Sequence, residues 1–164
     1  MLPDSLKDNP IAAAVEAACP AALLEGKLDR GELTLEVAPA EIVPVCRFLK
    51  EQQAFQRLST VTAVDRLPAE PRFEVVYHLH SVARSQRVRL KCRLSGEPLE
   101  IDSVTGVWRS ANWYEREVYD LFGVVFRHHP HLRRILMPEN WAGHPLRKDY
   151  PVHGYKYSYA DPES

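Results

Sequence analysis

The chain has 164 residues, of which 45% are hydrophobic and 26% are charged, and its formal net charge is -1. This size suits one domain rather than two, the charge balance argues against a dedicated nucleic-acid-binding domain, and the composition argues against disorder. We find neither an apolar stretch long enough to span a membrane nor the pattern of a signal peptide near the first residues, so a cytoplasmic protein is expected.

The three cysteines, Cys19, Cys46 and Cys92, lie far apart and form no Cys-x-x-Cys motif. An iron–sulfur cluster normally needs four thiolates, so we expect buried thiols that pack as small apolar side chains. The Gly-rich and nucleophile motifs of common cofactor-binding and hydrolytic enzymes are also missing. The sequence therefore predicts no cofactor in this chain.

The N-terminal part predicts two helices and two strands. Good helix formers predict a helix over 10–24, which Pro20 should end or kink. Strict alternation predicts a strand over 31–38, and apolar residues at helical spacing predict a helix over 40–53. A stretch rich in Thr and Val predicts a second strand over 56–66.

Residues 73–82 and 87–94 predict a β-hairpin, because both stretches alternate apolar and polar side chains. In the expected register His80 lies opposite Arg89. The outward face of the second strand carries four cations: Arg87, Arg89, Lys91 and Arg93. His78 and His80 share a face, but the cations facing them would repel a metal ion. A solvated or partner-facing basic surface is the favoured interpretation.

The remaining sequence predicts one more helix and then an arm. Helical spacing continues over 103–122 and ends at Gly123, with a break near 109–111 that would divide the helix in two. Five prolines and several aromatic residues then replace any periodicity. The predicted fold is α+β over 1–126, a small mixed sheet with helices packed on it. An extended partner-binding arm over 127–164 follows.

Three carboxylates lie within six residues of the last predicted helix: Glu115, Glu117 and Asp120. Helical spacing makes Glu117 and Asp120 neighbours and allows Arg116 to pair with Asp120. Paired carboxylates perform acid–base chemistry when their pKa values are driven apart, but nothing in the sequence indicates this. A salt-bridged helix used for structure or assembly is favoured over catalysis.

Three histidines follow the helix, at positions 128, 129 and 131, and a metal-dependent enzyme that uses them with Asp120 or Glu117 is one alternative. Pro130 splits the histidines, and Arg133 and Arg134 disfavour a bound cation nearby. Guanidinium groups instead suit carboxylates and backbone carbonyls. A third hypothesis is RNA binding by the outward cations of 87–94, which would weaken steeply with salt.

One motif joins these stretches. It contains Glu-Arg-Glu at 115–117, Asp-Leu-Phe at 120–122, and then His129, Arg133 and Ile135-Leu136, with Ala-Asn-Trp-Tyr at 111–114 before it and Gly-His-Pro-Leu-Arg-Lys-Asp-Tyr-Pro at 143–151 after it. This arrangement resembles the signature of the 30 kDa subunit family, also called the C subunit family, of NADH:quinone oxidoreductase, respiratory complex I. The resemblance is close over 56–152.

The resemblance implies a core subunit of the peripheral arm of a proton-translocating complex. Subunits D, B and I would be its partners, and it would support them during electron transfer from NADH to quinone. FMN, the iron–sulfur clusters and quinone would belong to partner subunits, and this chain would have no catalytic site. It would be peripheral, on the cytoplasmic side of the inner (plasma) membrane, and would contact the membrane only through the complex. The alternative is the equivalent subunit of a related membrane-bound hydrogenase or of a quinone oxidoreductase with another donor.

The motif also supplies the candidate site. We expect the following residues to bind partner subunits: Glu115, Arg116, Glu117, Asp120, His129, Arg133, Arg134, Arg147, Lys148, Asp149 and Tyr150. Among them, Arg133, Arg134, Arg147 and the Glu115–Asp120 cluster are expected to form buried or interfacial ion pairs.

Overall fold

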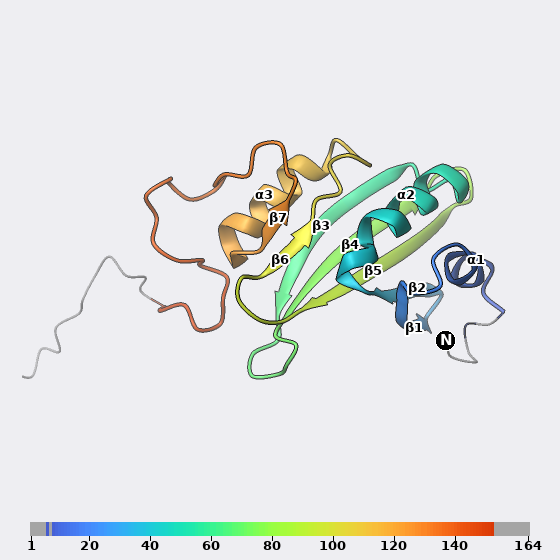
Figure 1. Ribbon diagram of the computed structural model, residues 1–164, viewed down its shortest axis with the longest axis horizontal. Coiled ribbons are helices and arrows are strands. Elements are labelled where there is room, and N and C mark those ends of the chain that lie inside the picture. Colours follow the sequence, from blue (N-terminus) through green and yellow to red (C-terminus); the bar gives the residue numbers. More distant parts are fainter. Residues whose placement is uncertain (1–5, 7, 153–164) are drawn as a thin grey trace, which may run out of the picture.

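The computed structural model describes residues 6 and 8–152 and has a twisted sheet at its centre (Figure 1). Its elements in chain order are α1 (Pro10–Ala18), β1 (Leu23–Asp29), β2 (Glu32–Val37), the 3-10 turn η2 (Pro39–Glu41), α2 (Ile42–Gln52), β3 (Arg57–Asp65), β4 (Phe73–Ser81), β5 (Gln86–Leu94), β6 (Glu100–Asp102), α3 (Ala111–Phe122) and β7 (Val125–Arg127). No helix in this described part is long and apolar enough to cross a membrane.

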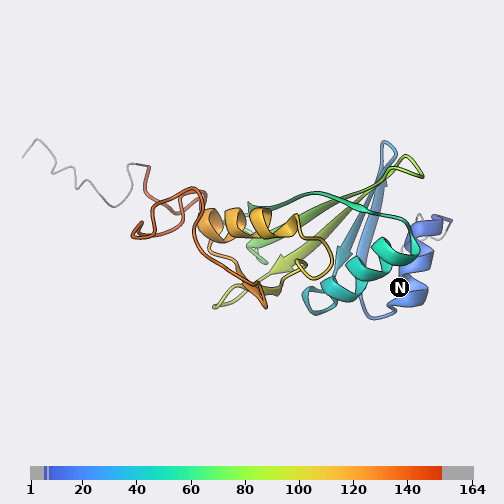
Figure 2. The ribbon, with the colours of Figure 1, turned by 90° about the horizontal axis from the view of Figure 1, so that it is seen from above.

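The main sheet has five strands in the order β1-β2-β5-β4-β3. Neighbouring strands are antiparallel, except for β2 and β5, which are parallel, so the sheet is mixed. The short strands β6 and β7 pair separately. Helices α2 and α3 lie towards opposite ends of the long axis (Figure 2). After β7 the described chain continues without helices or strands. The predicted α+β fold with a small mixed sheet is confirmed.

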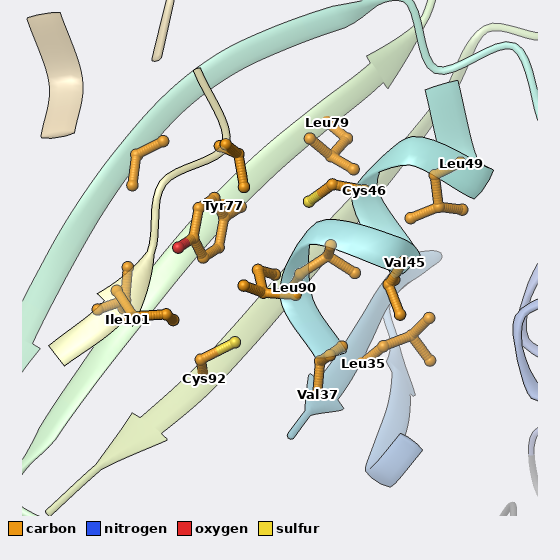
Figure 3. Close-up of a cluster of buried hydrophobic side chains, with 14 of the residues drawn as sticks. Leu35, Val37, Val45, Cys46, Leu49, Tyr77, Leu79, Leu90, Cys92 and Ile101 are labelled. Atoms are coloured by element: carbon orange, nitrogen blue, oxygen red, sulfur yellow. The ribbon is translucent and has the colours of Figure 1, made fainter. Parts of the chain in front are cut away.

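The core lies between the sheet and the helices (Figure 3). Alternate residues of β2, β4 and β5 point into it, among them the fully buried Leu35, Tyr77 and Leu90. Helix α2 contributes its apolar face, including Leu49 and the buried thiol of Cys46. The opposite face of the sheet carries the polar residues of the same strands.

The helix predicted over 10–24 is too long. Helix α1 ends at Ala18, and Leu23 already belongs to β1, which pairs with β2. Proline at position 20 cannot donate the backbone hydrogen bond that would continue the helix, so the chain turns there. At the other end the Asn9 side chain caps α1 by accepting the N–H groups of Ile11 and Ala12.

The hairpin register differs from the expected one by two residues. His80 lies opposite Arg87 and not Arg89, because the turn occupies 82–85. The strands themselves and the shared face of His78 and His80 are as predicted.

The last helix is also shorter than its predicted range. Residues 103–108 form turns, and α3 begins at Ala111, where the sequence indicated a break. It ends at Gly123, which adopts a left-handed conformation with φ of 78°. That conformation favours glycine, as expected for a helix C-terminus.

Candidate assembly site

The carboxylate of Asp120, fully buried near the end of α3, organises the chain that follows β7. Its Oδ2 accepts the backbone N–H groups of Ile135, Leu136 and Met137 at 3.0, 2.8 and 2.8 Å. Its Oδ1 forms a 2.6 Å ion pair with Arg134. We call these contacts the Asp120 anchor and residues 128–152 the C-terminal segment. One side chain thus fixes the backbone of residues 135–137 and binds the Arg134 side chain.

The electrostatics of the Asp120 anchor favour the ionised carboxylate. Burial alone would raise the pKa of Asp120, but the N–H of Met137, the Arg134 guanidinium and the N–H groups of Ile135 and Leu136 outweigh it, so the pKa is lowered. A carboxylate that accepts three backbone hydrogen bonds and one guanidinium has its lone pairs satisfied. The predicted buried ion pair of Arg134 is therefore present.

Two arginines bind backbone carbonyls of the C-terminal segment. Arg134 donates through Nη2 to the carbonyls of Trp141 and Gly143, both at 2.9 Å. Arg116 donates to the carbonyls of Arg133 and Arg134, both at 3.1 Å. The expected pairing of Arg116 with Asp120 on the helix surface is therefore wrong, because each side chain reaches the C-terminal segment instead.

The segment also covers the C-terminal end of α3, whose last carbonyl groups lack partners within the helix. Arg147 donates through Nε to the carbonyl of Phe122 at 2.6 Å, and Nδ1 of His144 lies 2.9 Å from the carbonyl of Asp120. A Cβ atom at Gly123 would lie only 2.6 Å from both of these side chains. Within this chain Arg147 caps the helix, and the buried or interfacial ion pair expected for it stays a prediction.

A second carboxylate, Asp65 at the end of β3, holds the far end of the segment. Arg72 binds it through Nε and Nη2 at 2.9 and 2.7 Å, and the N–H of Lys148 donates to Oδ2 at 2.8 Å. Arg72 also binds both oxygens of Asp149 at 2.8 Å. Hydrogen bonds from Arg72 hold the pKa of Asp65 well below its usual range. We call this group the Asp65 anchor.

Glu115 lies on the buried face of α3, and its carboxylate faces residues 103–105 inside the domain. Its Oε1 accepts the N–H of Val104 at 2.7 Å, and its Oε2 accepts the hydroxyl of Ser103 at 2.6 Å. Burial raises the pKa of Glu115 to about 7, although these two hydrogen bonds lower it. Glu115 is therefore a buried group that exchanges a proton near neutral pH.

The buried His129 side chain lies beside Glu115, with 3.9 Å between Nε2 and the Oε2 of Glu115. Its Nε2 lies 3.2 Å from the carbonyl of Asn112, and its Nδ1 accepts the N–H of His131 at 3.0 Å. Because Nδ1 accepts, we assign a neutral ring that carries its proton on Nε2. Burial lowers the pKa of His129, and the nearby Arg116 lowers it further.

The other predicted site residues lie nearer the surface. Glu117 and Arg133 are exposed, and Lys148 is exposed but donates through Nζ to the carbonyl of Leu67. The hydroxyl of Tyr150 donates to the carbonyl of Ala142 at 3.3 Å. Within the described residues, no group of three His, Cys, Asp or Glu side chains is arranged to hold a metal ion. The donors named in the metal-enzyme hypothesis are not assembled into a site.

Sequence reasoning missed Asp65, Arg72 and Ser103. The first two are separated from Lys148 and Asp149 by more than 70 residues, so no spacing rule connects them. Ser103 was only the first residue of the helix predicted over 103–122, yet its hydroxyl donates to Glu115.

The match to known proteins covers most of the chain. The model of the family described as respiratory-chain NADH dehydrogenase, 30 Kd subunit, matches residues 35–156. The chain belongs to this family. It is therefore a subunit of NADH-quinone oxidoreductase, respiratory complex I, as the motif indicated.

Particular relatives and solved structures are similar to the chain over most of its length. The C subunit of NADH-quinone oxidoreductase from Geobacter sulfurreducens is 53% identical over 135 residues, which cover 82% of this chain and 83% of that protein. Among solved structures, the trypsin-resistant fragment of Nqo5 has a TM-score of 0.65 and 30% identity, covering 74% of this chain and 98% of that one. A chain of the archaeal membrane-bound sulfane sulfur reductase, a respiratory membrane complex, has a TM-score of 0.75 and 31% identity, covering 89% and 86%.

Proposed function

We propose that this chain is a structural subunit, without cofactor or catalytic site, in the peripheral arm of complex I. It supports the quinone-reducing D subunit and the iron–sulfur B and I subunits during electron transfer from NADH to quinone, coupled to proton translocation. FMN, the clusters and quinone belong to partner subunits. The chain lies on the cytoplasmic side of the inner (plasma) membrane and contacts the membrane only through the complex.

The observation that carries this proposal is the Asp120 anchor. A segment without helices or strands normally leaves backbone groups to water, but here side chains of α3 bind them and hold the segment in one shape. Large apolar side chains are nevertheless exposed on and beside it, with Trp113 at 61%, Leu136 at 60% and Leu146 at 52%. An ordered surface with exposed apolar and aromatic side chains is typical of a protein interface.

The predicted partner-binding residues divide into two groups on this basis. Glu115, Arg116 and Asp120 are buried; Arg116 and Asp120 bind the segment from within, and Glu115 holds residues 103 and 104. Glu117 and Arg133 expose their side chains and remain candidates for direct contact with partner subunits. The buried residues of the charged motif thus hold the segment in place, and the exposed residues around them form the interface.

Assembly of the whole complex tests the proposal. We expect Leu136→Asp combined with Leu146→Asp to leave the chain folded, by circular dichroism, while strongly reducing its content in the complex on native gels. NADH:quinone reductase activity of the membranes should fall in parallel, because the complex is lost rather than altered. The matched control is Leu24→Asp, a leucine that is 56% exposed on β1. Normal assembly of the double variant would contradict the proposal.

A truncation provides a second test. The predicted boundary at 126/127 crosses β7, which ends at Arg127, and His129 is buried, so the cut belongs after Leu132. We expect this shortened chain to fold with lowered stability, because the buried Asp120 loses its partners, and to be absent from the complex at temperatures where circular dichroism shows it folded. A shortened chain that assembles fully would show that the segment is not needed.

A further inference from the structure

A hollow on the main sheet is lined by residues of β2, β5, β4 and β3. The hollow measures about 530 Å³, and its lining includes Arg57, His78, His80, Arg87 and Arg89. None of these residues belongs to the assembly site described above.

Strand register explains why the cations gather there. His80 on β4 lies directly opposite Arg57 on β3 and opposite Arg87 on β5. Residues that pair across neighbouring strands project from the same face, so the three side chains form one row. One row further along, His78 lies opposite Thr60 and Arg89.

The charges in this row are not balanced, unlike those on the rest of the same face. Lys91 pairs with Glu74 at 3.1 Å, and Arg93 pairs with Glu36 at 3.1 Å. Glu32 is the one carboxylate that lines the hollow, and Arg89 binds it at 2.8 Å.

The guanidinium groups of Arg57 and Arg87, by contrast, have no ion pair or hydrogen bond to any residue that the structure describes. Burial and the positive charges of Arg89 and Lys91 lower the pKa of His78, although Glu32 acts in the opposite direction. The hollow therefore carries excess positive charge.

A second hollow of about 470 Å³ continues the first towards the turns. The two share Glu32, Leu33, His80 and Arg87, and the second adds Arg30. We call the two hollows together the basic groove. Across β3, β4 and β5 the Cα atoms of Arg57 and Arg87 lie roughly 10 Å apart, from the usual strand spacing. This length fits an extended chain with several charges better than one compact anion.

We infer that the basic groove docks an extended acidic segment, rich in Asp and Glu, from another subunit of the same complex. The inference rests on the proposed function, which makes other subunits its neighbours. Charge complementarity carries it: two unpaired guanidinium groups suit carboxylates in a bidentate manner. Single-stranded RNA is less suited, because its bases need aromatic platforms and the lining offers only the two histidine rings.

The test uses the assembled complex with charge-reversed variants. In the groove variant, Arg57→Glu and Arg87→Glu are combined. The matched control combines Lys27→Glu and Arg84→Glu, which make the same change in net charge at exposed positions outside the groove lining. We expect the NaCl concentration that releases half of the chain from the complex to fall about twofold or more for the groove variant, since exposed charge contacts are screened by salt. The control should behave like the parent chain.

A photo-crosslinking amino acid at Ser59, which lines the groove, identifies the occupant. We expect crosslinks to an Asp- and Glu-rich peptide of another subunit, and fewer of them in the groove variant. Crosslinks to lipid or nucleic acid alone, or equal salt release of parent and groove variant, would overturn the inference and leave the proposed function standing. Absence of the parent chain from the complex would overturn both.

Discussion

The sheet domain and the C-terminal segment are ordered by different physical means. In the domain, apolar side chains of strands and helices exclude water, and Leu35, Leu49 and Leu90 are fully buried. The segment has no helix or strand within 128–152, and its order comes from side chains of Asp120 and Asp65 that bind its backbone and charges. Burial is non-directional, whereas each hydrogen bond in the anchors needs one particular atom in one place.

This difference means that the two regions should respond to different substitutions. Loss of an apolar contact in the domain spreads over many weak interactions. Loss of one anchor carboxylate, by contrast, removes several directional bonds to the segment at once.

The largest effect is expected for Asp120→Ala. It leaves the Arg134 guanidinium and three backbone N–H groups without their acceptor, and breaking a buried ion pair from one side costs about 3–5 kcal/mol. Hydrogen exchange should show this loss at the amides of 135–137 and little change in β4. Glu117→Ala, on the exposed side of the same helix, should change stability by less than about 0.5 kcal/mol. Equal loss of protection in β4 would mean that the two regions unfold together.

Glu115→Gln should change how stability depends on pH. The folded pKa of Glu115 is about 7, above the ordinary value of 4.5. Protonated Glu115 therefore stabilises the folded state at pH values below 4.5, and this stabilisation is lost as the pH rises through 7. Relative to the parent chain, the glutamine variant should gain about 2 kcal/mol between roughly pH 5 and pH 8.

Denaturant unfolding across this range measures the difference between the two proteins. The lowered pKa of His129 acts in the opposite direction, so its contribution is lost as pH falls, and it is common to both proteins. A constant difference between the two proteins at every pH would show that Glu115 does not titrate in the folded state.

Tyr77→Phe tests the core. The Tyr77 hydroxyl is buried and has no hydrogen-bond partner among the residues that the structure describes. An unsatisfied buried polar group costs about 1–3 kcal/mol, so removing it should leave stability unchanged or raise it by about 1 kcal/mol. A clear loss in thermal or denaturant unfolding would reveal a partner for this hydroxyl. Tyr150→Phe is the control at a hydroxyl that does have a partner.

The smallest effect is expected for Asp149→Ala. Asp149 is half exposed and shares Arg72 with the buried Asp65, so its loss should cost about 0.5 kcal/mol and the cost should shrink at high salt. Proteolysis near residue 148 and unfolding at two salt concentrations measure it. A salt-independent loss of several kcal/mol would make this pair as important as the Asp120 anchor.

Most of the fold could be predicted because local patterns carried it. Alternation located β2, β4 and β5, and glycine at 123 marked the end of α3. The pattern failed at β1, whose Leu24 and Leu28 are exposed on an edge strand, and at β6 and β7, which are three residues long. The hairpin register was missed because a four-residue turn fits at either of two positions.

The site was predictable as a group of residues but not as a set of contacts. The charged motif directed attention to Asp120 and Arg134, which do pair. Helical spacing suggested partners within α3, whereas the real partners lie 14 to 17 residues further along the chain. Such contacts depend on where the backbone returns after β7, and sequence periodicity carries no information about that path.

Two separated anchors make the C-terminal segment a bivalent ligand for its own domain. While Asp120 holds residues 135–137, Lys148 and Asp149 remain at high effective concentration near Asp65 and Arg72, and the reverse holds as well. While one anchor stays bound, the contacts of the other therefore re-form quickly after a local opening. A protein that binds the stretch between the anchors meets a chain whose ordering entropy has already been lost during folding, so less of its binding energy is spent on that ordering.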